Sequence, residues 1–167
     1  MVHRPVSIAI DERRAFFRNN LWHPKPDGGP RDIKQVWFPG VHCDVGGGYP
    51  EPQSGLSKLA LKWMLREATE AGLQVNPASV DLVLGNQGQG FAPPDANGMM
   101  HESLTGFWKA AEFVRKPYYD SVTGKEQRRM NLFRRRMIPQ NSMVHESAFI
   151  RAGNYAPRLP PNAIRVS

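Results

Sequence analysis

The pattern of hydrophobic and polar positions predicts a strand followed by a helix in the first half of the chain. An apolar run that begins at Val36 predicts a strand over 34–38, and Pro39 ends or bends it because proline cannot donate a ladder hydrogen bond. Over 56–71, apolar residues recur at spacings of three and four, which predicts an amphipathic helix with one buried stripe. Gly72 ends that helix as a C′ glycine. The order is therefore strand, glycine-rich loop and helix.

The remaining elements are predicted to be short, because 15 Pro and 15 Gly interrupt the chain. Residues 7–18 are expected to form a helix capped by Ser7, and Asn76-Pro77 to start another that ends near Leu84. The other expected elements are a helix over 101–114 with Leu104, Phe107, Trp108, Ala111 and Val114 facing inward, a hairpin within 117–138, a helix over 142–151, loops at 22–32 and 85–98, and a Pro-rich tail.

Length and composition indicate one domain, or part of one, with a packed core. The 167 residues are 40% hydrophobic and 10% aromatic, which argues against wholesale disorder. The single cysteine, Cys43, excludes an intramolecular disulfide and suits a reducing compartment. The first 20 residues lack the apolar core of a secretory signal, and no apolar stretch approaches the roughly 20 residues that span a bilayer. We therefore expect a cytoplasmic location in the producing cell, with any export through a system that needs no cleavable signal.

The chain is basic, with a formal net charge of +7 and a pI of about 9.9. Such a surplus favours anionic partners such as phospholipid head groups, nucleic acid or an acidic protein. One dense cluster comprises Arg128, Arg129, Arg134, Arg135 and Arg136. A charge run alone specifies no ligand, so a solvated face is the simplest interpretation. Of the anionic partners, phospholipid is preferred and nucleic acid is not expected.

His42 is the first candidate for chemistry, because it follows the predicted strand where the loops of an α/β protein converge. Its ordinary pKa lies near neutrality, so it could act as a general acid and base. A buried histidine with satisfied hydrogen bonds is an equally good interpretation. Asp44 could support His42, although two residues of separation in a turning loop favour a different role. We favour a carboxylate that accepts backbone N–H groups of the glycine turn.

Other chemistries have weaker support in the sequence. The histidines have no metal-binding spacing such as His-Glu-x-x-His, so neither a metal nor a cofactor is expected. The three glycines after Val45 match neither the phosphate-loop nor the dinucleotide-binding pattern. Cys43 is expected to be a small packing side chain. His101 and His145 are expected to cap or pack, although either could line the same pocket as His42.

The segment Val-Trp-Phe-Pro-Gly-Val-His-Cys-Asp-Val-Gly-Gly-Gly-Tyr at 36–49 closely resembles the C-terminal part of a bacterial and fungal α/β-hydrolase family that includes type VI secretion phospholipase effectors. Flanking pieces agree with this resemblance: Ile-Asp-Glu-Arg-Arg at 10–14, Met-His-Glu-Ser-Leu-Thr-Gly-Phe-Trp-Lys at 100–109 and Val-His-Glu-Ser at 144–147. The resemblance implies a serine hydrolase with a Ser, Asp, His order, in which His42 matches the triad histidine. It also implies a lipid ester as substrate.

The resemblance thus implies an α/β fold in which residues 1–167 form a single partial α/β-hydrolase-like domain with the last core strand, the histidine loop and several helices. The chain contains no Gly-x-Ser-x-Gly, so the half with the nucleophile elbow is expected to lie on an upstream polypeptide. Without that serine, we expect the chain alone to be inactive. Two alternatives stay open: a non-catalytic basic module that binds anionic lipid or nucleic acid, and an inactive remnant.

A partial domain has a structural consequence. If the strand at 34–38 lacked neighbours, it would have unpaired edges. We then expect an exposed apolar face around Trp37, Phe38, Leu59 and Trp63.

Overall fold

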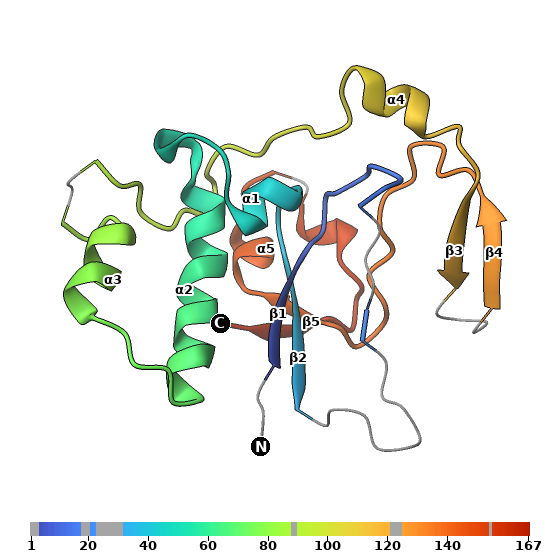
Figure 1. Cartoon of the computed structure of the whole chain (residues 1–167). Coiled ribbons are helices and arrows are strands. Elements are labelled where there is room, and N and C mark those ends of the chain that lie inside the picture. Colours follow the sequence, from blue (N-terminus) through green and yellow to red (C-terminus); the bar gives the residue numbers. More distant parts are fainter. Residues whose placement is uncertain (1–3, 18–20, 23–31, 88–89, 121–124, 154) are drawn as a thin grey trace.

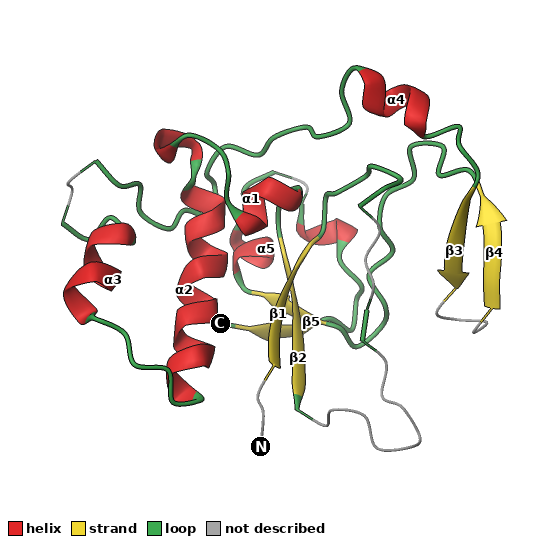
Figure 2. Cartoon of the chain, in the orientation of Figure 1, coloured by secondary structure: helices red, strands yellow, loops and turns green. Residues whose placement is uncertain are grey.

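The computed structural model describes the chain apart from residues 1–3, 18–20, 23–31, 88–89, 121–124 and 154. It is a mixed α/β structure with a four-stranded parallel sheet and several helices (Figures 1 and 2). The sheet has the order β1-β2-β5-β6, in which every neighbouring pair is parallel. Its strands are β1 (Arg4–Ala9), β2 (Ile33–Phe38), β5 (Met143–His145) and β6 (Ile164–Val166).

The predicted strand at 34–38 is confirmed as β2, which lies inside the sheet between β1 and β5. Because successive side chains point to opposite faces, β2 supplies two cores. Trp37 packs with Ile8 and Val144 on one face. Val36 and Phe38 pack on the other face with Trp63. The expected exposed apolar face is therefore wrong.

The exposed fractions show how complete this burial is. Trp37 and Phe38 are each 1% exposed and Trp63 is 2% exposed, while Leu59 is half-buried. The physical reason is that both edges of β2 are paired, and that helix α2 covers one face of the strand.

The helix expected over 7–18 is wrong, because this stretch begins with strand β1 and continues as a turn. The apolar residues Val6, Ile8 and Ile10 alternate with period two, which is the strand pattern, and β-branched side chains favour a pleated surface. β1 pairs with β2 in register from Arg4 with Ile33 to Ala9 with Phe38. This pairing outweighs any helix-capping tendency of Ser7.

Two helices after β2 agree with the sequence patterns. Helix α2 (Gly55–Glu70) ends as predicted, since Gly72 has φ +100° and Leu73 N–H donates to the Ala68 carbonyl in a Schellman arrangement. Helix α3 (Pro77–Val83) starts at Asn76, whose side-chain oxygen accepts the N–H groups of Ala78 and Ser79. The predicted loop before α2 instead contains two short helical turns, α1 (His42–Gly46) and η1 (Glu51–Gln53).

The helix expected over 101–114 is shorter than predicted. Helix α4 (Phe107–Ala111) has only five residues, because Gly106 with φ +51° starts it and residues 101–105 are held in an extended loop. Leu104 and Ala111 are buried as expected, but Phe107 is 84% exposed and Val114 is 49% exposed. The inward-facing stripe is therefore wrong at these two positions.

The hairpin after α4 is confirmed, since β3 (Lys116–Asp120) and β4 (Lys125–Arg129) pair antiparallel. Its predicted turn lies outside the described residues. In Figure 1 the hairpin stands apart from the central sheet, at the far side of α4.

The carboxyl-terminal segment also differs from the prediction. The helix expected over 142–151 is instead strand β5 followed by the short helix α5 (Ser147–Ile150). The Pro-rich tail contains η2 (Ala156–Arg158) and strand β6, which extends the parallel sheet. Three-residue strands are too short for an alternating pattern to show, so only pairing defines them: β5 pairs with β2, and β6 pairs with β5. Among the described residues, no helix is long and apolar enough to cross a bilayer.

We expect Trp63 to be a main determinant of stability. Trp63→Ala should lower the free energy of unfolding by about 3–5 kcal/mol, because a large buried side chain leaves a cavity beside Phe38. Trp63→Phe should lower it by less than about 1.5 kcal/mol, since the buried indole N–H has no hydrogen-bond partner among the described residues. Urea denaturation followed by far-ultraviolet CD measures both values. Equal losses in the two variants would contradict this assignment.

Candidate functional site

His42 lies at the carboxyl end of the central strand β2, as the first residue of α1. The chain turns between them at Gly40, which has φ +109°. A Cβ atom at Gly40 would lie 2.4 Å from the Asp44 Cβ, so this turn requires glycine. The His42 side chain is exposed, and its ring lies 5.1 Å from the ring of Phe17. The turn thus presents the imidazole to solvent at the edge where the loops converge.

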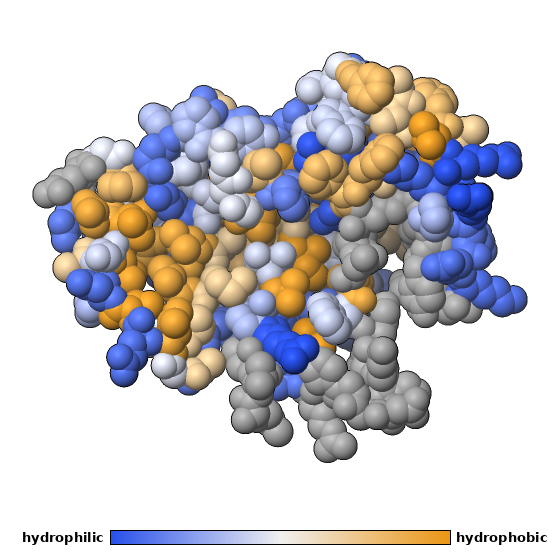
Figure 3. Space-filling model, viewed as in Figure 1, coloured by the Kyte–Doolittle hydropathy of each residue, from blue (hydrophilic) through white to orange (hydrophobic). Residues whose placement is uncertain are grey.

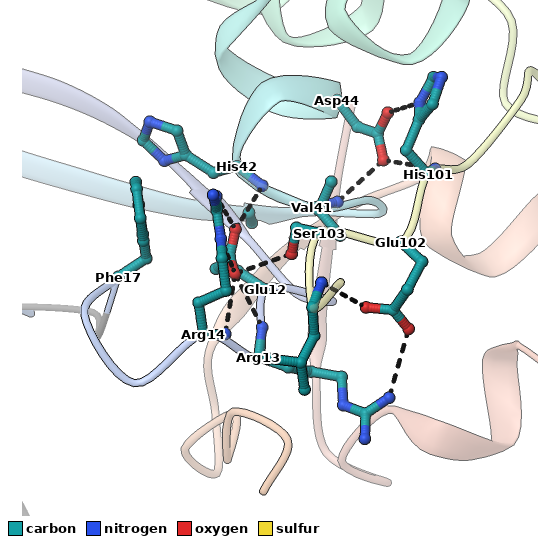
Figure 4. Close-up of polar contacts among 12 residues, drawn as sticks. Glu12, Arg13, Arg14, Phe17, Val41, His42, Asp44, His101, Glu102 and Ser103 are labelled. Atoms are coloured by element: carbon teal, nitrogen blue, oxygen red, sulfur yellow. Dashed lines mark hydrogen bonds and ion pairs between the residues drawn. The ribbon is translucent and has the colours of Figure 1, made fainter. Parts of the chain in front are cut away.

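Glu12, which follows β1, hydrogen-bonds the start of α1 and the loops beside it (Figure 4). Its carboxylate is 1% exposed and accepts two hydrogen bonds from the Arg14 guanidinium, at 2.8 and 2.9 Å. It also accepts the Ser103 hydroxyl at 2.9 Å and the His42 backbone N–H at 3.2 Å. Glu12 therefore fixes the start of α1 through the backbone N–H of His42, and it makes no hydrogen bond with the His42 imidazole.

The electrostatics of Glu12 follow from these contacts. Burial raises the pKa of the Glu12 carboxyl, but the hydrogen bonds from Arg14, Ser103 and the His42 backbone outweigh burial and lower the pKa from 4.5 to about 2. The hydrogen bond to the Glu12 carboxylate raises the pKa of the Arg14 guanidinium. The guanidinium also lies over the Phe17 ring at 3.7 Å. Glu12 is thus a charged structural anchor near the candidate site.

Asp44 pairs with His101, which lies 57 residues away in the sequence. One carboxylate oxygen lies 2.6 Å from His101 Nδ1, and the other accepts the backbone N–H groups of Val41 at 3.0 Å and His101 at 3.1 Å. His101 Nε2 lies 2.9 Å from the side-chain oxygen of Gln53, and Tyr49 stacks on the ring at 3.5 Å. These contacts attach loop 101–105 to α1.

The arrangement separates the two residues that the sequence singled out. In Figure 4 the Asp44 carboxylate points toward His101, while the His42 ring lies on the other side of α1 beside Phe17. Asp44 accepts backbone N–H groups, as expected for a turn, but they belong to Val41 and His101 instead of the glycines. The assignment of His42 as general acid and base stays a prediction.

A second buried carboxylate, Asp11, follows β1 and bonds both the turn after β2 and the C-terminal segment. It accepts the Gly40 N–H at 2.8 Å, the Tyr155 hydroxyl at 2.6 Å and the Arg158 guanidinium at 2.5 Å. Burial and the adjacent Asp11 charge raise the pKa of the Tyr155 hydroxyl far above its usual range. Asp11 and Glu12 were not recognised as site residues from the sequence, although both lie in the Ile-Asp-Glu-Arg-Arg segment that carried the family resemblance.

The remaining candidates have packing roles. His145 is buried and stacks on Phe38 at 4.5 Å; burial lowers its pKa to about 4, so it is neutral at pH 7. This agrees with the packing role expected for it. Cys43 is a free, half-buried thiol. Within the described part of the chain, no group of three or more His, Cys, Asp or Glu side chains could hold a metal ion.

Fold and site together define a mixed α/β protein that presents an exposed histidine at the carboxyl edge of a parallel sheet. Residues 3–67 match the sequence model of the family described as "T6SS, Phospholipase effector Tle1-like, catalytic domain", which confirms the resemblance to phospholipase effectors over this part of the chain. The matched segment contains β1, β2, α1 and most of α2, together with Glu12 and His42.

One relative of the chain is an uncharacterized protein of Saccharomyces cerevisiae, YEL023C. The two sequences are 42% identical over 52 residues, which is 29% of this chain and 8% of the yeast protein. The chain thus spans only a small part of that relative. No solved structure matches the chain.

We expect Glu12 to make stability depend on acid pH. Because its folded pKa of about 2 lies below its ordinary value of 4.5, its contribution is complete above pH 4.5 and is lost as the pH falls toward 2. Glu12→Gln should flatten the stability profile in this window. It should also lower the free energy of unfolding at pH 7 by about 3 kcal/mol, since Arg14 loses its buried partner. Urea denaturation from pH 7 to pH 2 measures both effects, with the exposed Glu70→Gln as control. A profile as steep as that of the unsubstituted chain would contradict the assignment.

We expect Asp44 and His42 to differ sharply in their effect on stability. Asp44→Ala should lower the free energy of unfolding by about 2–4 kcal/mol, because two backbone N–H groups and His101 lose their acceptor. His42→Ala should change it by less than about 0.5 kcal/mol, because the side chain is exposed. Chemical denaturation compares the two. A large loss in His42→Ala would show that the imidazole is a structural group.

Proposed function

We propose that this chain forms the histidine-bearing part of an α/β-hydrolase domain that cleaves carboxylic esters of phospholipids. The observation that carries the proposal is the exposed imidazole of His42 at the carboxyl end of β2, inside the segment that matches the phospholipase effector family. Reactive groups of α/β proteins collect at this edge of the sheet. The family match extends the proposal to a substrate of type VI secretion, held in the cytoplasm before export.

The exposed ring of His42 supports a role in proton transfer. Within the described part of the chain, no carboxylate bonds its imidazole, and its ring contact is with Phe17. Two acidic groups of this region have other partners, because the Glu12 carboxylate bonds Arg14 and the Asp44 carboxylate bonds His101. We therefore propose that a triad built on His42 takes its orienting carboxylate from outside the described residues. Its serine would come from a segment beyond these 167 residues, which contain no Gly-x-Ser-x-Gly.

The sheet offers a place for that segment. Strand β1 pairs with β2 on one side, and its other side has no strand partner among the described residues. A parallel strand added there would end at the same edge as β1 and β2, so a nucleophile elbow after that strand would approach His42. The 167-residue sequence contains no Gly-x-Ser-x-Gly.

The chemistry proposed for His42 is proton transfer. Its imidazole takes the proton of the serine hydroxyl as that oxygen attacks the ester carbonyl, and returns it to the leaving alcohol. In the second half it takes a proton from water as the water oxygen attacks the acyl-serine carbonyl. It then returns that proton to the serine oxygen as the acyl–oxygen bond breaks, which releases the fatty acid and restores the serine hydroxyl. An imidazole can both accept and release a proton, so one side chain can perform both transfers.

The first test is the coding DNA upstream of Met1, in all frames. A Gly-x-Ser-x-Gly segment flanked by predicted βα units is expected there, and it would supply the missing nucleophile. If no such segment is found, the proposal of a split or longer hydrolase fails.

The second test is hydrolysis of a phospholipid or a short-chain ester. The pure 167-residue chain should show no hydrolysis, and the chain joined to the serine-bearing segment should hydrolyse the ester. In that active form, His42→Ala should reduce kcat by about 10⁴-fold or more. The exposed Lys62→Ala on α2 is the control and should have no effect. Full activity of the His42→Ala form would contradict the proposed role.

A further inference from the structure

Most of the excess positive charge lies on one stretch of the chain, from α4 through the hairpin to the loop after it. Residues 107–136 contain nine Lys or Arg and three Asp or Glu, so this stretch carries +6 of the formal net charge of +7. Its exposed cationic side chains are Lys109, Arg115, Lys125, Arg128, Arg134 and Arg135. The stretch forms its own protrusion beside the central sheet (Figure 1).

The same stretch also exposes large apolar side chains. Phe107 is 84% exposed, Phe113 54%, Val114 49% and Leu132 45%, and the adjacent Met137 is 74% exposed. Figure 3 shows hydrophobic side chains gathered over α4, next to hydrophilic ones over the hairpin. Large apolar side chains that are exposed together in one region are uncommon on a protein surface, and they are a feature of interaction sites.

A buried carboxylate holds this patch in place. Glu112 is 0% exposed and accepts the backbone N–H groups of Ala15 at 2.6 Å and Phe133 at 3.0 Å, and the Asn131 amide at 2.6 Å. It thereby joins α4 to the loop after β4, where the Phe113 and Phe133 rings meet at 5.8 Å.

The loop itself is strained, because Leu132 and Phe133 have φ values of +50° and +61°. Two successive non-glycine residues in this region each raise the free energy by about 1–2 kcal/mol. The contacts of Glu112 maintain this backbone, in which Leu132 is exposed and Phe133 contacts the Phe113 ring.

We propose that this surface docks the protein on a bilayer of anionic phospholipid. Exposed cations attract the negative head groups, and exposed Phe, Leu, Val and Met side chains enter the interfacial region. Nucleic acid would use the cations, but it would gain little from exposed Leu, Val and Met side chains. We call this the docking surface and define it by five exposed residues: Phe107, Phe113, Leu132, Arg128 and Arg134. Binding of a bilayer by this surface does not depend on hydrolysis of the lipid.

The docking surface is continuous with the surroundings of His42. Trp108 of α4 lies 5.9 Å from the Phe16 ring and 5.7 Å from the Phe17 ring, and Phe17 lies 5.1 Å from His42. A bilayer held at α4 would therefore lie close to the candidate catalytic imidazole. Only this consequence rests on the proposed function.

The test is binding of the 167-residue chain to sedimented vesicles of phosphatidylcholine with and without phosphatidylserine. We expect binding that rises with the phosphatidylserine fraction and falls with salt. Phe107→Ser with Phe113→Ser, and separately Arg128→Gln with Arg134→Gln, should each weaken binding about tenfold or more. The matched control is Leu73→Ser with Lys62→Gln, which changes one exposed apolar and one exposed basic side chain near α2. It should bind as the unsubstituted chain does.

Several results would overturn the proposal. Equal binding to vesicles without phosphatidylserine, or an equal loss in the control, would remove this surface as the docking site. Tight binding of an oligonucleotide that is unchanged by the two Phe substitutions would indicate that the cationic side chains bind nucleic acid. Concentration-dependent self-association that is lost in the Phe variant would assign the apolar patch to contact between copies. Near-ultraviolet CD on each variant establishes that its fold is retained.

Discussion

The parallel pairing of β1 with β2 is the constraint on which the rest of the structure depends. It pairs Ala9 with Phe38, so the two strands end side by side, and the residues after them must turn over the same edge. Asp11 and Glu12 then lie next to Gly40 and His42, and they accept the backbone N–H groups of both. The site is a direct consequence of strand register, since a shift by one residue would move every side chain to the other face.

Buried carboxylates organise the loops around this edge. Asp11, Glu12, Asp44 and Glu112 are each 7% exposed or less, and each accepts at least one backbone N–H from a segment distant in sequence. A buried charge is tolerated only where donors satisfy it, so each carboxylate holds its partner segments in one arrangement. Loops that lack regular structure thereby gain a defined geometry.

This organisation explains how one side chain is left available at the edge. The groups around His42 use their hydrogen-bonding capacity on one another, while its own backbone N–H is held and its imidazole is exposed. The aromatic contacts of Phe17 with His42 and with Trp108 then connect the imidazole to the basic, apolar protrusion. The proposed hydrolase role depends on this exposed imidazole, and the proposed membrane docking depends on the basic, apolar protrusion beside it.

Local patterns in the sequence determined the elements that depend on neighbouring residues. These are β2, α2 with its Gly72 end, α3 with its Asn76 cap and the β3-β4 hairpin. The position of His42 after a buried strand was also readable, because the strand and the turn are adjacent in sequence. The alternation of Val6, Ile8 and Ile10 was a local strand signal, but only the pairing with β2 decides that residues 4–9 form a strand. The addition of β6 by the tail depends likewise on its pairing with β5.

The same division applies to the candidate site. The sequence singled out His42 and Asp44 and favoured a structural role for Asp44, and the fold joins Asp44 to His101 and Glu12 to the backbone of His42. These partners lie 57 and 30 residues apart along the chain, so no spacing rule could pair them. The sequence by itself determined which side chains could do chemistry. Only the tertiary structure decided which of them became structural ties, because hydrogen bonds form between groups that packing brings within reach.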